Sequence, residues 1–152
     1  MTPGKLRAAT VLARATQVQA MLDGISALPQ GSLDEFVSDP RTVAAAESYL
    51  RRALEGLLDL ARHLLAKGFG RAPAEYKQLA TELLRLGVLD HDHADTMTEL
   101  ACYRNRMVHF YDEISDRELY AICTEQVTDV SSLLQALLTW VRLHPEKLDG
   151  SL

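Results

Sequence analysis

Residues that interrupt helices or build sheets are scarce in this sequence. Its 152 residues include only 8 glycines, 5 prolines and 3 phenylalanines, whereas β-rich folds need many turn-forming and aromatic residues. No stretch shows the apolar and polar alternation of a half-buried strand, and neither an internal repeat nor a low-complexity tract is present. These absences argue against β and repeat architectures and favour an all-helical chain.

Cysteines and long apolar runs are also scarce. The 2 cysteines, Cys102 and Cys123, lie in apolar stretches and are too few to frame a disulfide scaffold, so we interpret them as small buried hydrophobic residues. No segment approaches the roughly 18 uninterrupted apolar residues of a membrane span, and Arg7 and Arg14 interrupt any signal-peptide core. We therefore expect a cytoplasmic protein without a membrane segment.

Positive charge is in the minority, with a formal net charge of −5. This balance argues against a general nucleic-acid coat protein, because such binding depends largely on neutralising phosphates. Basic residues nevertheless gather in the second quarter of the chain, and acidic residues gather after position 90. The asymmetry predicts two faces of opposite sign, suited to self-association or to a charged partner.

The chain does have the length and the apolar periodicity of one helical domain. With 47% hydrophobic residues it can bury a sizeable core, and we expect a single domain over residues 1–152. Apolar residues recur at three- and four-residue spacing. The predicted helices span about residues 3–28, 40–67, 73–86, 90–108 and 116–143. Four are long and the third is short, which predicts an up-and-down bundle of five helices with the third bracing one end.

Local signals mark several of these boundaries. Asp39-Pro40 is a typical helix start, since Asp accepts hydrogen bonds from free amides and Pro suits the first helical position. Ser115, with Glu118 three residues later, predicts a capping box before the last helix. Residues 33–39 are predicted to be an irregular connector or a short turn.

The residues best suited to chemistry lie at the end of the fourth predicted helix. Within eight positions the chain has the guanidiniums of Arg104 and Arg106, the imidazole of His109 and the phenol of Tyr111. Arginine offers a fixed fork of donors that suits a phosphate, and histidine takes and gives protons near neutral pH. The combination points to chemistry on a phosphodiester.

Helix geometry limits how these groups can cooperate. On a continuous helix Arg104 and His109 project about 140° apart, whereas Arg106 and His109 are neighbours at three-residue spacing. Arg104 and His109 can act together if the helix unwinds near His109, or if two chains contribute to one site. A two-fold dimer, the commonest oligomer, would gather two copies of these groups in one cleft.

The pattern Arg-x4-His-x-Tyr of Arg104, His109 and Tyr111 resembles the motif of HEPN-domain ribonucleases. Asn105, directly after the arginine, makes the HepT-like toxins the closer match. The resemblance extends over about residues 40–140 through helix order and length, and the N-terminal helix is not matched by motif. It implies an HEPN-like bundle that acts, as a homodimer, as the metal-independent endoribonuclease toxin of a toxin–antitoxin module.

The resemblance also implies roles for individual residues. Arg104 and His109 would be the catalytic pair, and Asn105 would position the substrate with support from Arg106. An MntA-like nucleotidyltransferase antitoxin would silence the toxin by attaching AMP to Tyr111. The implied substrate is RNA, and neither a cofactor nor a metal ion is expected.

Elementary chemistry agrees with these roles. Metal-free RNA cleavage requires attack of the 2′-hydroxyl on the adjacent phosphorus, and an imidazole that moves protons contributes ~10²–10⁴-fold. An arginine stabilises the charge that builds on the phosphate. Because DNA lacks the 2′-hydroxyl, this mechanism selects RNA.

Simpler interpretations stay open for each residue taken alone. Arg104 and Arg106 can be surface groups paired with nearby carboxylates, and His109 and Tyr111 can be packed side chains with hydrogen-bonded tips. The alternative function is a non-catalytic helical dimer that serves as an interaction module for a nucleotidyltransferase partner.

Two other clusters are weaker candidates. His91 and His93 suggest a metal site, but side chains two apart on a helix diverge by about 200°, so we interpret them as part of a solvated helix start. Glu47 and Glu55 have the spacing of a carboxylate pair, yet each lies four residues from Arg51, which favours ion pairs.

Overall fold

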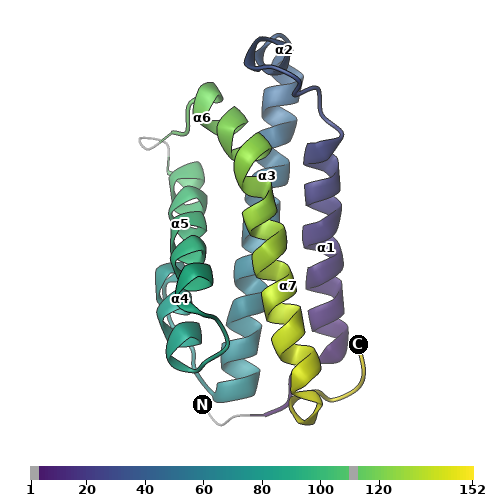
Figure 1. The fold of residues 1–152 in the computed structure, drawn as a ribbon, viewed down its shortest axis with the longest axis vertical. Coiled ribbons are helices and arrows are strands. Elements are labelled where there is room, and N and C mark those ends of the chain that lie inside the picture. The colour runs from purple at the N-terminus through teal and green to yellow at the C-terminus, as the bar shows by residue number, and fades with distance from the viewer. Residues whose placement is uncertain (1–3, 110–112) are drawn as a thin grey trace.

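The protein is an all-α bundle, as the sequence predicts. The computed structural model describes residues 4–109 and 113–152, and within these ranges the one strand-like feature is a bridge between Leu6 and Leu148. Figure 1 shows α1, α3, α5 and α7 running side by side along the long axis. The helices are α1 (Ala8–Ser26), α2 (Leu33–Val37), α3 (Pro40–His63), α4 (Tyr76–Arg85), α5 (His91–Val108), α6 (Asp116–Ala121) and α7 (Val127–Leu143), with short helical turns η1 (Leu64–Gly68), η3 (Ile122–Gln126) and η4 (Pro145–Lys147).

The five predicted helical stretches correspond to observed ones. The π-helical turn η1 continues α3, and α6, η3 and α7 follow one another without interruption over residues 116–143. The first helix starts later than predicted, at Ala8. The Leu6 N–H donates to the Lys147 carbonyl, and the Asp149 N–H donates to the Leu6 carbonyl. Because this pairing holds the backbone extended, the helix cannot begin before it.

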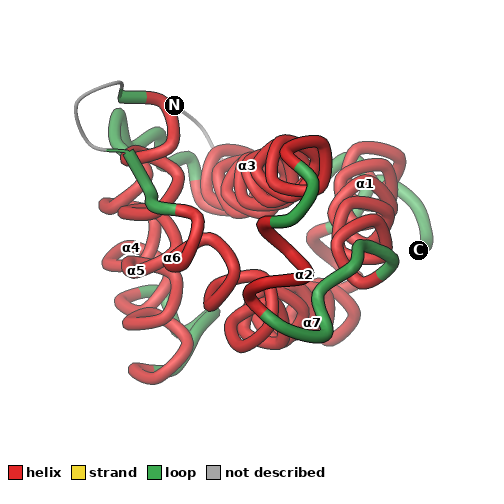
Figure 2. Tube along the Cα trace, turned by 90° about the horizontal axis from the view of Figure 1, so that it is seen from above, coloured by secondary structure: helices red, strands yellow, loops and turns green. Residues whose placement is uncertain are grey.

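Helix α2 is an addition to the prediction, and it takes the place expected for the third helix. Figure 2 shows α2 lying across one end of the bundle, where it contacts α3 and α6. Phe36 of α2 is fully buried, and its ring centroid lies 5.4 Å from that of Tyr120 in α6. The predicted brace, α4, instead lies alongside α5 (Figure 1). Phe36 explains the difference, because one buried aromatic ring anchors a five-residue helix that has little stability alone.

Local capping defines the helix starts that matter for the site. The Asp39 carboxylate accepts from the Arg41 N–H and Pro40 occupies the first position of α3, as predicted. Asp90 begins α5 by accepting from the His93 N–H at 2.8 Å. Ser115 begins α6 by accepting from the Glu118 N–H at 3.1 Å. Each cap satisfies an amide that would otherwise lack a partner at a helix end.

Helix α3 is the centre of the bundle and packs most extensively on α1. Two glycines permit their close approach. A Cβ at Gly56 of α3 would lie 2.9 Å from Val18 of α1, and a Cβ at Gly24 of α1 would lie 2.7 Å from the Tyr49 ring of α3. Side chains of ordinary size at either position would force the two helices apart.

The core is aliphatic and continuous from one end of the bundle to the other. Leucine is its commonest residue and is most frequent in α3 and α7, and each fully buried leucine contributes about 1.5–3 kcal/mol relative to an exposed one. The fully buried leucines of α3 are Leu50, Leu54, Leu57, Leu58 and Leu60. Among the described residues no helix is both long enough and apolar enough to cross a membrane.

Candidate active site at the end of helix α5

The helix that carries the arginines ends one residue before His109. Val108 is the last residue of α5, and His109 has extended backbone angles, φ −110° and ψ 117°. Its N–H donates to the Arg106 carbonyl at 3.3 Å, and its side chain is exposed. The unwinding near His109, one of two geometries that the sequence left open, is therefore present. Tyr111 lies outside the described residues.

Arg106 ties the end of α5 to the start of α6. Its guanidinium donates to both carboxylate oxygens of Glu118, at 2.9 and 2.7 Å, and to the Glu113 carbonyl at 3.5 Å. This forked pair lowers the pKa of the Glu118 carboxyl from its ordinary value. The predicted capping box is correct in its Ser115 half, but the Glu118 side chain binds Arg106 instead of completing the box.

Arg104 is held on the opposite side of α5 by residues of α3 and α4. Its Nε lies 3.5 Å from Glu55 Oε1, its Cζ lies 4.7 Å from the centroid of the Tyr76 ring, and its Nη1 donates to Asn105 Oδ1 at 3.3 Å. The side chain is only 25% exposed. An arginine restrained in this way keeps few rotamers, which is what positioning a phosphate requires.

Tyr76 is fixed in turn by α3. Its hydroxyl donates to Asp59 at 3.2 Å, and the Arg62 guanidinium lies 4.5 Å from the ring centroid. Burial, followed by the neighbouring Asp59 carboxylate, raises the pKa of the Tyr76 phenol above its ordinary value. The phenol therefore stays protonated and keeps donating to Asp59 at neutral pH.

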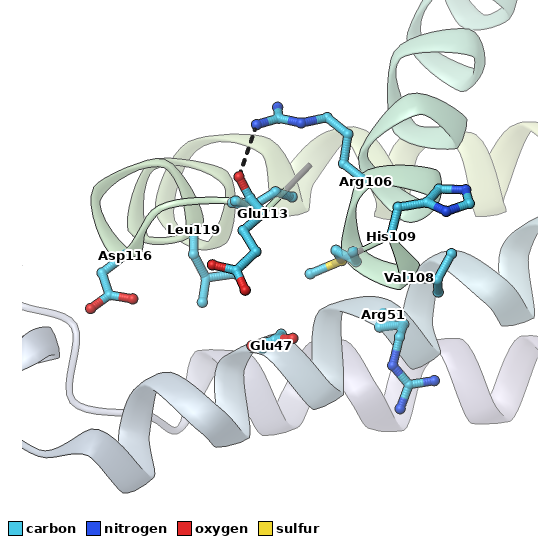
Figure 3. A pocket seen from close by; sticks show the side chains of 10 residues that line it. Glu47, Arg51, Arg106, Val108, His109, Glu113, Asp116 and Leu119 are labelled. Carbon is cyan, nitrogen blue, oxygen red and sulfur yellow. Dashed lines mark hydrogen bonds between the residues drawn. The ribbon is translucent and has the colours of Figure 1, made fainter. Parts of the chain in front are cut away.

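Arg104 and His109 line two different cavities. A cavity of about 530 Å³ lies among α3, the end of α5 and the start of α6, and His109 and Arg106 line it together with Arg51, Glu47, Glu113 and Asp116. Figure 3 shows these labelled side chains coming from the three elements. A groove of about 430 Å³ contains Arg104 and Asn105 with Arg62, Tyr76 and Lys77. As far as the described residues show, the predicted catalytic pair thus lies at two separate cavities of the single chain.

Sequence analysis missed the residues that hold Arg104. Glu55 was expected to pair with Arg51, and it does, at 3.4 Å, but it also faces Arg104. Glu55, Asp59 and Arg62 follow one another at four- and three-residue spacing, so they share one polar face of α3. That face was visible in the sequence. Its contact with Tyr76 and Arg104 depends on tertiary packing and was not.

His93, one of the weaker candidates for a metal site, takes part in contacts within the fold. The His93 ring contacts Asp90 Oδ1 at 2.9 Å and Ser132 Oγ at 3.2 Å, so it joins the start of α5 to α7. Across the described ranges, no three His, Cys, Asp or Glu side chains are grouped so as to hold a metal ion. Cys123 is buried, and burial raises the pKa of its thiol to about 12. Cys102 is half-buried.

Comparison with known proteins identifies what this fold resembles. A family model described as "Ribonuclease HepT-like" matches residues 13–137. A tri-AMPylated HEPN toxin of Shewanella oneidensis, solved in complex with an MNT antitoxin, superposes with a TM-score of 0.77 at 16% identity, over 86% of this chain and 97% of that one. YutE of Bacillus subtilis, a cytosolic protein of unknown function, superposes with a TM-score of 0.76 at 17% identity, over 94% of each chain. A toxin–antitoxin structure with AMP-PNP gives 0.76 at 15% identity, over 86% of this chain and 98% of that one. No curated protein matches the sequence.

Proposed function

The chain belongs to the HepT-like ribonuclease family, and from that premise we propose that it is a metal-independent endoribonuclease, the toxin of a toxin–antitoxin module. The observation that carries the proposal is the placement of Arg104 and His109 at the end of α5, one restrained beside a groove and the other exposed beside a cavity. The Shewanella HEPN toxin has a similar fold. An RNA-cleaving toxin acts where cellular RNA is, so we place the protein in the cytoplasm.

In the proposed reaction the 2′-oxygen of one ribose attacks the adjacent phosphorus, and the bond from phosphorus to the 5′-oxygen of the next nucleotide breaks. The products are a 2′,3′-cyclic phosphate and a 5′-hydroxyl. His109 moves the proton that leaves the 2′-hydroxyl or the proton that the 5′-oxygen gains, and Arg104 stabilises the charge on the phosphoryl oxygens. Asn105, hydrogen-bonded to Arg104, positions the substrate. Arg106 supports that geometry through its forked pair with Glu118, which ties the end of α5 to the start of α6.

We propose further that the working enzyme is a homodimer. Arg104 and His109 line separate cavities of one chain, so a two-fold axis that sets His109 of one protomer against the partner's Arg104 would complete each site. Co-purifying Arg104→Ala and His109→Ala chains with different tags tests this. Shared sites predict recovery of activity in the mixed dimer, which retains one intact site of two. Sites within one chain predict no recovery.

The proposed partner is an MntA-like nucleotidyltransferase antitoxin. It would transfer AMP from ATP to the Tyr111 phenol, whose oxygen bonds to the α-phosphorus as pyrophosphate leaves. The bound AMP would place a phosphate and a nucleoside next to the Arg104 site and block it. Intact-mass measurement after co-expression tests this, and we expect added adenylate mass that Tyr111→Phe abolishes. An unmodified wild-type chain would count against this form of control.

The decisive test of catalysis is cleavage of single-stranded RNA in the presence of EDTA. We expect Arg104→Ala and His109→Ala each to lower the rate at least ~10²-fold at unchanged helicity. His91→Gln, which changes an exposed histidine at the other end of α5, is the matched control and keeps full activity. If the wild type does not cleave RNA, the alternative of a non-catalytic interaction module for the nucleotidyltransferase replaces the proposal. Unchanged cleavage in both site variants would mean contamination or a different site.

A further inference from the structure

The groove beside Arg104 carries two further cations, Arg62 and Lys77, that the proposed cleavage reaction does not use. Three positively charged side chains line it, Arg62, Lys77 and Arg104, against the single carboxylate of Glu75. The lining side chains thus include more cations than carboxylates although the net charge of the chain is −5, and Asp59 and Glu55 outside the lining offset part of that charge.

That arrangement is organised around one ring. The guanidiniums of Arg62 and Arg104 lie 4.5 and 4.7 Å from the centroid of Tyr76, and the Tyr76 hydroxyl is anchored to Asp59 of α3. Arginine held against an aromatic face keeps its donors directed. Two like charges fixed near one ring also repel each other, and an anion in the groove relieves that repulsion.

Neither guanidinium is saturated by the protein. The Nε atoms of Arg62 and Arg104 are buried and make no hydrogen bond to any described residue. Asp59 lies 4.0 Å from Arg62 and Glu55 lies 3.5 Å from Arg104, distances of ion pairs that lack hydrogen-bond alignment. Because both Nε atoms are buried, a ligand meets only the exposed part of each guanidinium, on side chains that are 40% exposed for Arg62 and 25% exposed for Arg104. Exposed Lys77 adds a charge at the rim.

We propose that this groove, formed by Arg62, Lys77 and Tyr76 next to Arg104 and Asn105, is a phosphate-backbone subsite for the single-stranded RNA. The inference rests on the proposed ribonuclease function. The subsite binds nucleotides next to the scissile phosphate on Arg104 and leads the strand along α4. It contacts phosphates and not the 2′-hydroxyl, so it provides affinity without sequence selection.

Binding in the groove and cleavage differ in their need for the 2′-hydroxyl. Because the groove does not use the 2′-hydroxyl, it binds a single-stranded DNA of the same sequence about as well as RNA, although the DNA cannot be cleaved. DNA is therefore an intact probe of the subsite in the wild-type protein, and it also inhibits RNA cleavage by occupying the groove.

Fluorescence anisotropy with a labelled single-stranded DNA, measured at several salt concentrations, tests the proposal. We expect Lys77→Gln and Arg62→Gln each to weaken binding about threefold to tenfold and to reduce the salt slope by ~0.7, the value for one lost phosphate contact on a single strand. Lys77→Gln leaves Tyr76 and Arg104 in place, so its effect does not depend on refolding of the groove. Arg142→Gln, at an exposed position of α7 outside the groove, is the charge-matched control and keeps wild-type affinity and slope.

Each outcome decides one of the two proposals. Wild-type binding that depends on Arg62 and Lys77, without RNA cleavage, keeps the subsite and removes the ribonuclease. Cleavage with unchanged binding and salt slope in both Arg62→Gln and Lys77→Gln removes the subsite and keeps the ribonuclease. Absence of wild-type binding to the DNA also overturns the subsite. So does an affinity for AMP equal to that for the strand, because a single nucleotide would then account for the binding.

Discussion

The two sides of α3 differ in chemistry although they belong to one helix. Toward α1 it presents buried aliphatic side chains and Gly56, where a Cβ would lie 2.9 Å from Val18. Toward α4 and α5 it presents Glu55, which is 29% exposed, and Asp59, which is 38% exposed. The first side makes the bundle rigid by excluding water. The second keeps charged groups partly hydrated, so that they can direct Arg104 without the full desolvation cost of a buried ion pair.

The largest expected effect is on the apolar side. Leu57→Ala removes a fully buried side chain and leaves a cavity, so we expect the free energy of unfolding to fall by about 2–5 kcal/mol. Chemical denaturation measures this. RNA cleavage per folded molecule should remain unchanged below the unfolding transition. A loss of cleavage in the fully folded variant would contradict the division of α3 into two sides.

On the polar side we expect the opposite pattern. Glu55→Gln removes the charge that faces the Arg104 Nε at 3.5 Å, so we expect kcat to fall about tenfold, equivalent to ~1.4 kcal/mol, while KM stays the same or falls. Thermal unfolding should change little because the pair is partly exposed. Glu146→Gln, an exposed carboxylate on η4, is the control. A rise in KM with unchanged kcat would show that Glu55 does not position Arg104.

Gly56→Ala tests the close approach of α1 and α3. Overpacking against Val18 costs about 1–3 kcal/mol and the higher helix propensity of alanine returns ~1 kcal/mol, so we expect a net loss of about 1 kcal/mol. Adding Val18→Ala should remove the clash, and a double-mutant cycle in urea measures the coupling. Additive losses would mean that the two residues do not meet.

The smallest expected effect is a pH dependence of stability that comes from His63, the last residue of α3. His63 Nε2 accepts from the Arg7 N–H at 3.1 Å. Burial first, and then the charges of Lys67, Arg7 and Arg14, lower the pKa of the imidazole. The folded state therefore disfavours the protonated form. The stability that the neutral His63 contributes to the folded state is fully present above the unfolded pKa of ~6.5. It is lost as the pH falls from there through the lower pKa of the folded state.

His63→Gln keeps an acceptor that does not titrate, so its stability should vary less than that of the wild type below pH ~6.5. Thermal unfolding of both proteins across pH 5 to about 8 measures the difference. Parallel curves would rule out His63 as the titrating group.

The sequence predicts those structural features that depend on residues close to one another in the chain. Asp39, Pro40 and Ser115 act on amides within a few positions, so the starts of α3 and α6 follow from local chemistry. The aliphatic spacing in α3 predicts its core face for the same reason. The sequence left two geometries open for Arg104 and His109, a helix that unwinds near His109 or a site shared by two chains. The sequence alone does not determine which of them occurs.

Contacts between distant segments account for what could not be predicted. Leu6 continues a plausible helical pattern but pairs with Leu148 from the other end of the chain. Arg104 has acidic neighbours in its own segment, yet its carboxylate partner is Glu55 from α3. In both cases the observed partner lies far away in the sequence.

The pairing of Leu6 with Leu148 has a consequence for engineering. Both ends of the described chain lie at the end of the bundle away from α2 and α6 (Figure 1), and the Ala8 N–H donates to the Asp149 carboxylate at 2.8 Å. The segments near the two ends of the described chain are thus hydrogen-bonded to each other. A short peptide joining the two ends would permit circular permutation, with new termini opened at the exposed Gly31 before α2. Such a permutant would leave α5 and its arginines covalently intact.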